Sequence, residues 1–387
     1  TTRLNELEPQ LKKEAERLRE QDDSIALFLS ASPFPYRPNV DYGDGFLFSY
    51  DEYTPRDQGG YNTPSGRNAF FMRHFGYRMR YGKLTQPESD VNLDVMERQF
   101  HEWLRSEGAL IGRSLEIEAD YSRDFVEAES ELGQKIDEGF EKLVERNEDG
   151  DYLYPLLAKY ADDNYDQLYM NKVLEAIKAS VFTPRVRQHL DMGRKVVVFH
   201  SYKQGVPGHP FHFPDTNPMG KPSPEMPDAQ WNQEWKEEVR QFNRDNPEFK
   251  DLDLGQINNP IKTFRDAFGD RVALYNGDVS KKQRGQNIAT FNRDGSGVDI
   301  LLAQVDAGKE GISVHDTTGD HQRSLMSLAR PARPTDAIQM EGRIYRTGNQ
   351  SNAVQEYAKL GLGFEERVYA TKVAERSRTA ENLAMGE

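Results

Sequence analysis

The chain has no cysteine among its 387 residues. This absence excludes disulfides, thiolate metal sites and cysteine nucleophiles, and it fits a reducing compartment. No apolar run approaches the length that spans a bilayer, and the N-terminus lacks the pattern of a signal peptide. We therefore expect a protein that does not work in a membrane and that holds no metal through sulfur.

Positive charge is also in short supply. The 64 acidic residues outnumber the 50 lysines and arginines, which gives a formal net charge of −14. Phosphate contacts need lysine and arginine, so this balance is unusual for a nucleic-acid binder. It does not exclude one, because binding depends on where the positive charge lies. The ordinary hydrophobic content and generous aromatic content indicate a folded chain of two or three domains.

A third absence concerns nucleotide binding. The sequence contains no phosphate-binding loop of the form G-x-x-x-x-G-K-S/T and no acidic D-E-x-H box. Gly220-Lys221-Pro222-Ser223 resembles the end of such a loop in its residue types only. It lies in a proline-dense stretch, and Pro222 removes an N–H that a phosphate would need. Nothing in the chain is therefore expected to hold the β- and γ-phosphates of a nucleotide or its Mg²⁺.

The first half of the chain reads mainly as helices. A charged amphipathic helix is expected over Thr1–Asp23, followed by a short buried strand that ends in the turn Ser30-Ala31-Ser32-Pro33. The stretch 39–66 is rich in Tyr, Gly, Asp and Pro, which indicates loops. Further helices are expected at 67–84 in part, 91–107, 125–146 and 153–182, and 109–118 as a strand or connector.

After Pro184 short apolar runs alternate with helices. Arg194–His200 is typical of a central parallel strand. The stretch 204–227 is too rich in proline for a regular element. Further strands are expected at 271–275, 298–303 and 324–329, and helices at 231–242, 261–268, 281–291, 337–345 and 364–383. This alternation predicts an α/β fold, a parallel sheet with helices on both faces.

The strongest motif is Gln339-Met-Glu-Gly342-Arg343-Ile-Tyr-Arg346, with the spacing Q-x-x-G-R-x-x-R. On a helix, Gln339, Arg343 and Arg346 would share one face. Two guanidiniums on one face can clamp a polyphosphate or stabilise a phosphoryl group during transfer. The alternative is a solvated basic face. Glycine inside a helix costs about 1 kcal/mol, so Gly342 indicates close packing against another element.

Two other patterns follow buried strands. Leu301–Ser313 is a strand that opens into a loop with Gly308 and Gly311. Ligands bind at the carboxyl ends of parallel strands, and glycine lets backbone N–H groups approach phosphates. An ordinary strand-to-helix turn would look the same. In the segment 275–284 a strand ends at Gly277, and Ser280 with Gln283 can form a capping box without any function.

In order and spacing these segments resemble helicase superfamily 2. Ser30-Ala31-Ser32 is similar to motif III, Val196–Ser201 to motif IV, Leu301–Ser313 to motif V and Gln339–Gln350 to motif VI. Within the superfamily the chain resembles the Swi/Snf branch, and most of all the strawberry notch-like helicases. There a G-I-S-L segment, a turn and a D-x-x-I-Q-x-x-G-R helix are similar to GISVHD and ARPARPTDAIQMEGRIYRTGNQ. The resemblance is dense from Arg271 to Gln350.

The resemblance implies a division of the chain into two parts. Residues 1–120 would be the C-terminal part of a first RecA-like lobe with a helical protrusion. Residues 121–387 would be a second RecA-like lobe, with a Pro-rich insertion at about 204–260 and a C-terminal helix. The phosphate loop and acidic box of relatives would lie upstream of Thr1, so the chain alone is expected not to hydrolyse ATP.

The resemblance also implies residue roles. Arg343 and Arg346 would be arginine fingers acting on ATP and Mg²⁺ held mainly by the first lobe. Gln339 and Gly342 would support them, Gly308 and Gly311 would shape the motif V loop, and Ser313 would contact a ribose. His200, Ser201, Gly277, Arg284 and Gln304 would lie along the nucleic-acid track, and Ser30 and Ser32 would couple nucleotide state to grip. In departure from the pattern, Gln304 and Val305 replace hydroxyl residues, Tyr345 replaces a common His, and Asp306 is acidic.

The function implied is the C-terminal motor half of an ATP-dependent DNA helicase or translocase. Its partners would be DNA, single- or double-stranded, and a first lobe in the same or another chain. The expected setting is the cytoplasm, with a phage virion or a eukaryotic nucleus as variants. The alternative is a non-catalytic helicase-like binding or structural module, for example in a phage or mobile-element anti-restriction polypeptide. A third reading, an unrelated nucleotide-binding α/β enzyme, is disfavoured by the paired arginines.

Two weaker features remain. Basic residues (Arg67, Arg73, Arg78, Arg80, Lys83) interleave with aromatic ones (Phe70, Phe71, Phe75, Tyr77, Tyr81). Such a mixture suits stacking on single strands, but a helix that buries its aromatic face while its arginines reach solvent is the favoured interpretation. His209 and His212 flank Pro-Phe with no third ligand nearby, so zinc is not expected.

Overall fold

The computed structural model describes residues 34, 37–55, 63–88, 90–110, 119–205, 208–221, 223–308, 312–329 and 334–366. The chain divides into two compact units, the first mainly residues 1–115 and the second mainly residues 116–371. Several expected features lie outside the described residues: the helix over 1–23, the strand with Ser30 and Ser32, most of the connector at 109–118, Gly311, and the terminal helix beyond residue 366. Within the described part, no helix combines the length and apolar character needed to cross a bilayer.

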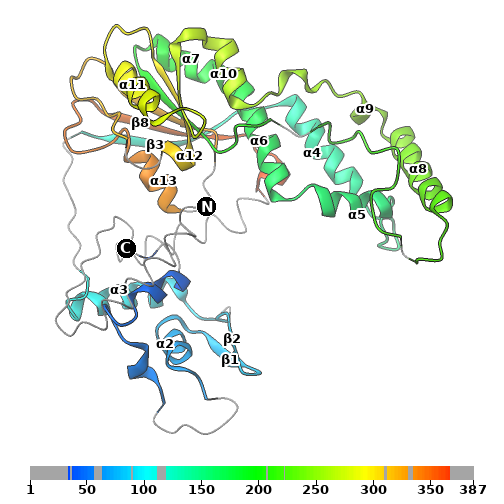
Figure 1. The fold of residues 1–387 in the computed structure, drawn as a ribbon, viewed down its shortest axis with the longest axis horizontal. Helices are drawn as coiled ribbons and strands as arrows, with labels where there is room; N and C mark the ends of the chain where they lie inside the picture. The colour runs from blue at the N-terminus through cyan, green and yellow to red at the C-terminus, as the bar shows by residue number, and fades with distance from the viewer. Residues whose placement is uncertain are drawn as a thin grey trace. The chain divides into compact units, whose positions relative to one another are not determined.

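The second unit is built on a six-stranded sheet in the order β3-β8-β7-β4-β6-β5 (Figure 1). Every neighbouring pair is parallel. The strands are β3 (Tyr121–Glu127), β4 (Lys195–His200), β5 (Val272–Tyr275), β6 (Ile300–Gln304), β7 (Arg323–Ser327) and β8 (Ala353–Lys359). The expected α/β fold class, a parallel sheet with helices around it, is confirmed, whereas its RecA-like character stays a prediction.

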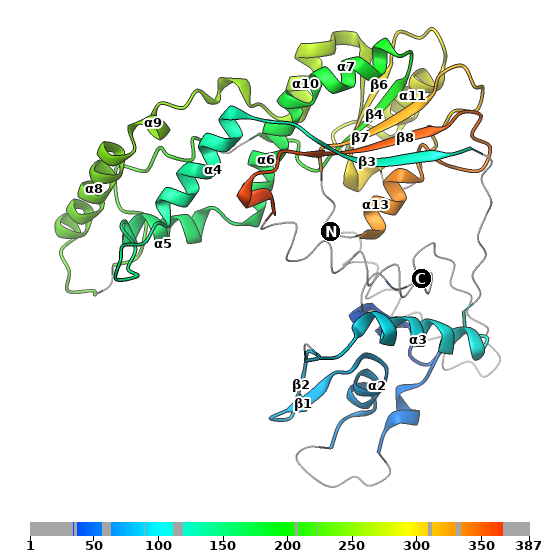
Figure 2. The ribbon, with the colours of Figure 1, turned by 180° about the vertical axis from the view of Figure 1, so that it is seen from behind.

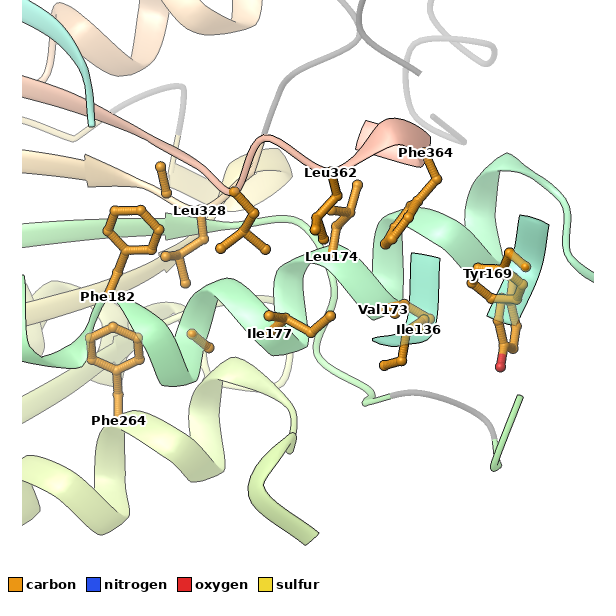
Figure 3. Close-up of a cluster of buried hydrophobic side chains, with 14 of the residues drawn as sticks. Ile136, Tyr169, Val173, Leu174, Ile177, Phe182, Phe264, Leu328, Leu362 and Phe364 are labelled. Carbon is orange, nitrogen blue, oxygen red and sulfur yellow. The ribbon is translucent and has the colours of Figure 1, made fainter. Parts of the chain in front are cut away.

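Alternating side chains of the central strands supply two separate cores. Val196 and Val198 of β4 face one core, whereas Val197 and Phe199 face the other. The first core is covered by α6 (Gln167–Val181), α7 (Thr183–Asp191) and α10 (Pro260–Phe268), and Figure 3 shows part of it around Ile177. The second is covered by α11 (Lys281–Asn292), α12 (Val305–Gly308) and α13 (Pro334–Glu341). A strand buried on both faces is expected to be mainly apolar, and the central positions Val196–Phe199 of β4 form a continuous apolar run.

A helical arm extends from the first core (Figure 2). It contains α4 (Glu131–Leu143), α5 (Pro155–Asn164), α8 (Asp228–Asp245) and α9 (Pro247–Lys250). The proline-dense stretch is irregular, as expected, but it is packed. Trp235 of α8 is buried and donates its indole N–H to the carbonyl of Pro214 at 2.8 Å. The Gly220-Lys221 pair lies in this stretch, where Lys221 forms a 2.7 Å ion pair with Asp228.

The first unit has a small aromatic core. Its elements are the 3₁₀ helices η1 (Arg37–Gly43) and η2 (Tyr50–Tyr53), the helices α2 (Gly66–Phe75) and α3 (Leu93–Ser106), and a hairpin of β1 (Arg78–Arg80) and β2 (Lys83–Thr85). Phe48, Phe70 and Phe100 pack together at its centre. That residues 1–120 are the tail of a first RecA-like lobe stays a prediction.

Three sequence expectations were wrong. The helix expected from Phe125 begins only at Glu131, because Tyr121–Glu127 is the edge strand β3. Strand β8 was not anticipated at all. The helix expected over 337–345 ends at Glu341 and continues as a tight turn, in which the N–H of Arg343 bonds the carbonyl of Met340 at 3.0 Å.

The smaller 3₁₀ helices η3 (Leu254–Gln256) and η4 (Gly269–Arg271) flank α10.

Candidate functional site

Arg343 joins two segments that are far apart in sequence. Its Nε donates to the carbonyl of Gln339 at 2.7 Å, and its Nη1 donates to the carbonyl of Ile312 at 3.0 Å. The N–H of Val314 returns a bond to the carbonyl of Arg343 at 3.2 Å. Charge-assisted bonds of this kind are among the stronger ones in proteins. The guanidinium therefore fastens the turn after α13 to the loop that leads into β7.

A buried carboxylate reinforces the same junction. Asp316 is fully buried, and its carbonyl accepts the N–H of Gln350 at 2.9 Å. Its Oδ2 accepts the hydroxyl of Ser351 at 2.6 Å, and its Oδ1 accepts the N–H of Gly319 at 2.9 Å. Burial alone would raise the pKa of Asp316, but these hydrogen bonds lower it overall. The loop around 312–316 and the turn at 343–351 are thus joined by several hydrogen bonds.

Arg346 lies on the surface of these joined segments. It is exposed, and it makes no side-chain hydrogen bond or ion pair with any residue that the structure describes. Close by, the hydroxyl of Ser313 lies 2.9 Å from Nδ1 of His315. Burial lowers the pKa of His315, and the positive charge of Arg346 lowers it further. We call Ser313, His315 and Arg346 the arginine surface. It offers a cation, a hydroxyl and an imidazole to an anion.

The other two motif residues differ from expectation. Gln339 holds Arg343 through its backbone carbonyl, while its buried side-chain Oε1 has no hydrogen-bond partner among the described residues. A Cβ on Gly342 would meet only the carbonyls of Ile338 and Gln339, at 3.3 and 3.6 Å. Among the described residues, the expected packing of Gly342 against another element is therefore not seen. Because the helix ends at Glu341, glycine there also avoids the cost of an interior position.

Glu341 is a connection that the sequence did not reveal. It is buried, accepts the hydroxyl of Tyr357 at 2.5 Å and pairs with Arg123. These partners lie on β8 and β3, so the carboxylate fixes α13 to the edge of the sheet. The ring of Tyr345 adds a contact with Tyr121, with 4.8 Å between centroids. No local pattern distinguishes Glu341 from a solvated glutamate, because its partners come from strands distant in sequence.

A second group of predicted residues lies at the carboxyl edge of the central strands. The Nε2 of Gln304, at the end of β6, donates to the carbonyl of Ser201 after β4 at 3.1 Å. His200 is fully buried, its Nδ1 lies 3.1 Å from the carbonyl of Tyr202, and burial lowers its pKa to about 4. His200 is therefore a neutral interior side chain that does not reach solvent, and Ser201 and Gln304 are the ones at the edge.

Gly277 and Arg284 extend the same edge toward β5. Lys203 forms a 2.5 Å ion pair with Asp278, which ties the loop after β4 to the loop after β5. The guanidinium of Arg284 lies 5.4 Å from the ring centroid of Tyr275. Ser280 caps α11 by accepting the N–H of Gln283 at 3.2 Å, as expected. The carboxyl ends of β4, β5 and β6 thus place Ser201, Gly277 and Gln304 along one sheet edge, with Arg284 on the helix that follows β5, whereas His200 is buried.

Glu175 of α6 completes this edge and was missed. Its buried carboxylate accepts the N–H groups of Ser201 at 3.0 Å and Tyr202 at 2.9 Å. Burial raises its pKa to about 7, and the two backbone bonds offset only part of that effect. The signal was available: a glutamate stands on the apolar face of a helix beside Leu174 and Ile177, where a charge needs a dedicated partner.

Gly308 has a packing role. A Cβ there would lie 2.9 Å from Cε1 of Phe199 and 3.0 Å from the Cβ of Ala303. Glycine lets α12 lie directly on strands β4 and β6. This is a reason for glycine that is independent of the close approach to phosphate expected from the sequence.

Comparisons with known proteins agree with the general class. No family model matches the chain. Over 79 residues it is 37% identical to a protein of Acanthamoeba polyphaga mimivirus that is assigned as an ATP-dependent RNA helicase. That match spans 20% of this chain and only 14% of the length of the viral protein.

The solved structures that match include part of an ATPase domain and a DEAD-box protein. The C-terminal part of the Fun30 ATPase domain matches 69% of this chain and 98% of its own, with 10% identity and a TM-score of 0.35. Escherichia coli SrmB, a DEAD-box protein solved with the regulator RraA, matches 52% of this chain and 79% of its own, with 14% identity and a TM-score of 0.28. The resemblance to the strawberry notch-like branch stays a prediction.

Proposed function

We propose that the chain is the motor lobe of an ATP-dependent helicase or translocase that supplies Arg346 to ATP held by another lobe. The observation that carries the proposal is the set of hydrogen bonds that joins the loop around 312–316 to the turn at 343–351. The segments that resemble motifs V and VI are separate in sequence, yet Arg343–Ile312, Val314–Arg343 and Gln350–Asp316 bonds join them. In this proposal Arg343 positions and Arg346 contacts the phosphates.

The described residues suit one side of a nucleotide site only. The arginine surface can face a phosphate, and an arginine aimed at a transferring phosphoryl group is worth about 10³-fold in rate or more. The sequence has no phosphate-binding loop. Among the described residues there is also no group of three or more His, Asp and Glu suited to a metal ion. We therefore assign the phosphates of ATP and Mg²⁺ to the other lobe, in this polypeptide or another.

Nucleic acid would lie along the carboxyl edge, at Ser201, Gly277, Arg284 and Gln304. Three of these positions flank strand ends that share one sheet edge, and Arg284 is a cation beside it. Phosphate contacts need such cations on a protein whose net charge is negative. DNA is the partner that the branch resemblance favours.

The test is ATP hydrolysis by the full-length parent polypeptide, with and without single-stranded DNA or RNA. Arg346→Ala should lower kcat about 10³-fold, because it removes the arginine finger. The fold should be unaffected, because the Arg346 side chain makes no hydrogen bond or ion pair with the described residues. Arg265→Ala, which removes an exposed arginine of α10, is the matched control and should hydrolyse ATP normally. Hydrolysis that is indifferent to Arg346 would refute the proposal. A parent that binds nucleic acid without hydrolysing ATP would be a helicase-shaped binding module instead.

A further inference from the structure

The hairpin of the first unit ends in an unusual turn. Strands β1 and β2 pair with Arg80 opposite Lys83, so Tyr81 and Gly82 alone form the connection. Their φ angles are 51° and 73°. Two positive φ angles define the type I′ turn, where Asn-Gly is the favoured pair. Tyr81 is the one non-glycine residue with positive φ in the part of the chain that the structure describes. A bulky side chain adopts that conformation only at a steric cost.

Tyr81 also stands apart from the other aromatic residues of its segment. Phe70, Phe71, Phe75 and Tyr77 are buried in the core of the unit, as the favoured sequence interpretation predicted. Tyr81 is 91% exposed. The fold therefore holds a tyrosine ring in water, on a strained backbone, and gains no contact from it. Strain of this kind at an exposed position is a reason to look for a function.

The surroundings of the ring are cationic. Arg78, Arg80 and Lys83 are exposed on the hairpin. Glu88 is the carboxylate that faces them, and it pairs with Arg78 at 2.6 Å and with Arg80 at 2.7 Å. One carboxylate shared by two guanidiniums leaves the hairpin positive, in a chain whose net charge is −14. Glu88 also holds both guanidiniums in place, which lowers the entropy lost when they bind a phosphate.

We propose that the hairpin tip binds single-stranded nucleic acid, with the ring of Tyr81 stacked on a base and Arg80 and Lys83 on the flanking phosphates. An exposed aromatic ring beside cations is the combination that binds single strands, because every base offers a flat face. A duplex interior would not offer that face. The inference rests on the proposed function in its choice of nucleic acid, and it adds a contact outside the sheet of the second unit.

The test is the binding of the full chain to fluorescein-labelled oligothymidylate, measured by anisotropy without ATP. Tyr81→Asn is the informative change, because Asn-Gly suits the turn better than Tyr-Gly. The variant should unfold at a temperature no lower than the wild type, yet bind about tenfold more weakly. Tyr81→Trp should bind at least as tightly as the wild type. The matched control is Tyr152→Asn, which removes an exposed tyrosine with an arginine 3.9 Å from its ring centroid, and it should bind normally.

Salt dependence separates stacking from phosphate contact. Lys83→Ala should reduce the slope of log affinity against log salt by about 0.7, whereas Tyr81→Asn should leave the slope unchanged. Wild-type affinity in a stably folded Tyr81→Asn variant would overturn the inference, and so would equal losses in Tyr152→Asn. Neither result would contradict the motor proposal, which is tested by ATP hydrolysis in the Arg346 variant. If hydrolysis proved not to depend on Arg346, the binding assay without ATP would still test stacking by Tyr81.

Discussion

At the scale of single residues, replacing two helical glycines by alanine should change the stability of the fold in opposite directions. Gly308 has the ring of Phe199 at 2.9 Å from where a Cβ would be, whereas Gly285 in α11 has nothing within 4 Å. Gly308→Ala should therefore destabilise the fold by about 1–3 kcal/mol through overpacking. Gly285→Ala should stabilise it by about 1 kcal/mol, because alanine loses less backbone freedom in a helix. Urea unfolding of both variants checks the pair, and equal effects would contradict the packing described.

Sequence spacing singled out Arg343 and Arg346, and their functional role stays a prediction, but the geometry expected for them was wrong. The Q-x-x-G-R-x-x-R pattern predicted one helical face for Gln339, Arg343 and Arg346. The helix ends at Glu341 instead, and Arg343 turns back to bond backbone carbonyls. Spacing cannot show where a helix stops when the backbone beyond its end bonds to another segment, as the carbonyl of Arg343 does to the N–H of Val314. His200 shows the same limit, since its burial depends on the whole sheet.

At the scale of elements, Glu356 of β8 holds α7 against the sheet. It accepts Nε of Arg185 and lies 3.0 Å from Nε2 of His189, both on α7. Burial raises the pKa of Glu356, but the bonds from His189 and Arg185 outweigh it and lower the pKa to about 2. Because the folded pKa is below the unfolded value, this stability is present above about pH 4.5 and is lost as pH falls toward 2.

Glu356→Gln should accordingly cost about 3 kcal/mol at neutral pH, since it removes the buried carboxylate that pairs with Arg185 and contacts His189. Urea unfolding measures this cost. The variant should also lose the acid-dependent part of the stability. Glu131→Gln, which breaks an exposed Glu131–Lys135 pair, is the control and should change little. A Glu356 variant as stable as the control would show that the buried contact does not hold α7.

The element pattern was predictable where an apolar face recurs. Strands β4, β5, β6 and β7 and the helices α6, α8, α10 and α11 follow runs that the sequence shows. Strand β3 was not predictable, because its residues are mostly exposed and show no alternation of apolar and polar side chains. It exists through pairing with β8, more than two hundred residues away in sequence, a contact that no local window contains.

Glu175 links α6 to the end of β4 and makes that edge sensitive to pH. Its folded pKa, raised to about 7, exceeds that of an unfolded glutamate. The stability it contributes is therefore fully present below about pH 4.5 and is lost as pH rises through 7. Between about pH 5 and pH 8 the wild type should lose roughly 2 kcal/mol relative to Glu175→Gln, judged by urea unfolding. A constant difference between the two proteins across that range would contradict the assignment.

At the scale of the whole molecule, the described residues of this acidic chain include two places where cations are exposed. One is the arginine surface of the second unit, and the other is the hairpin tip of the first. Both are small, so a net charge of −14 is compatible with phosphate ligands at particular places. We propose that the described residues supply one side of a nucleotide site, and we place the phosphates of ATP on a second lobe.

The most direct test of the central claim is single-turnover ATP hydrolysis by the parent polypeptide, measured beside nucleotide affinity. Arg346→Ala should reduce the hydrolysis rate about 10³-fold while ATP binds almost as tightly, because an arginine finger acts mainly in the transition state. That result would identify Arg346 as catalytic and the chain as a motor lobe. An unchanged rate, or a loss explained entirely by weaker ATP binding, would contradict it.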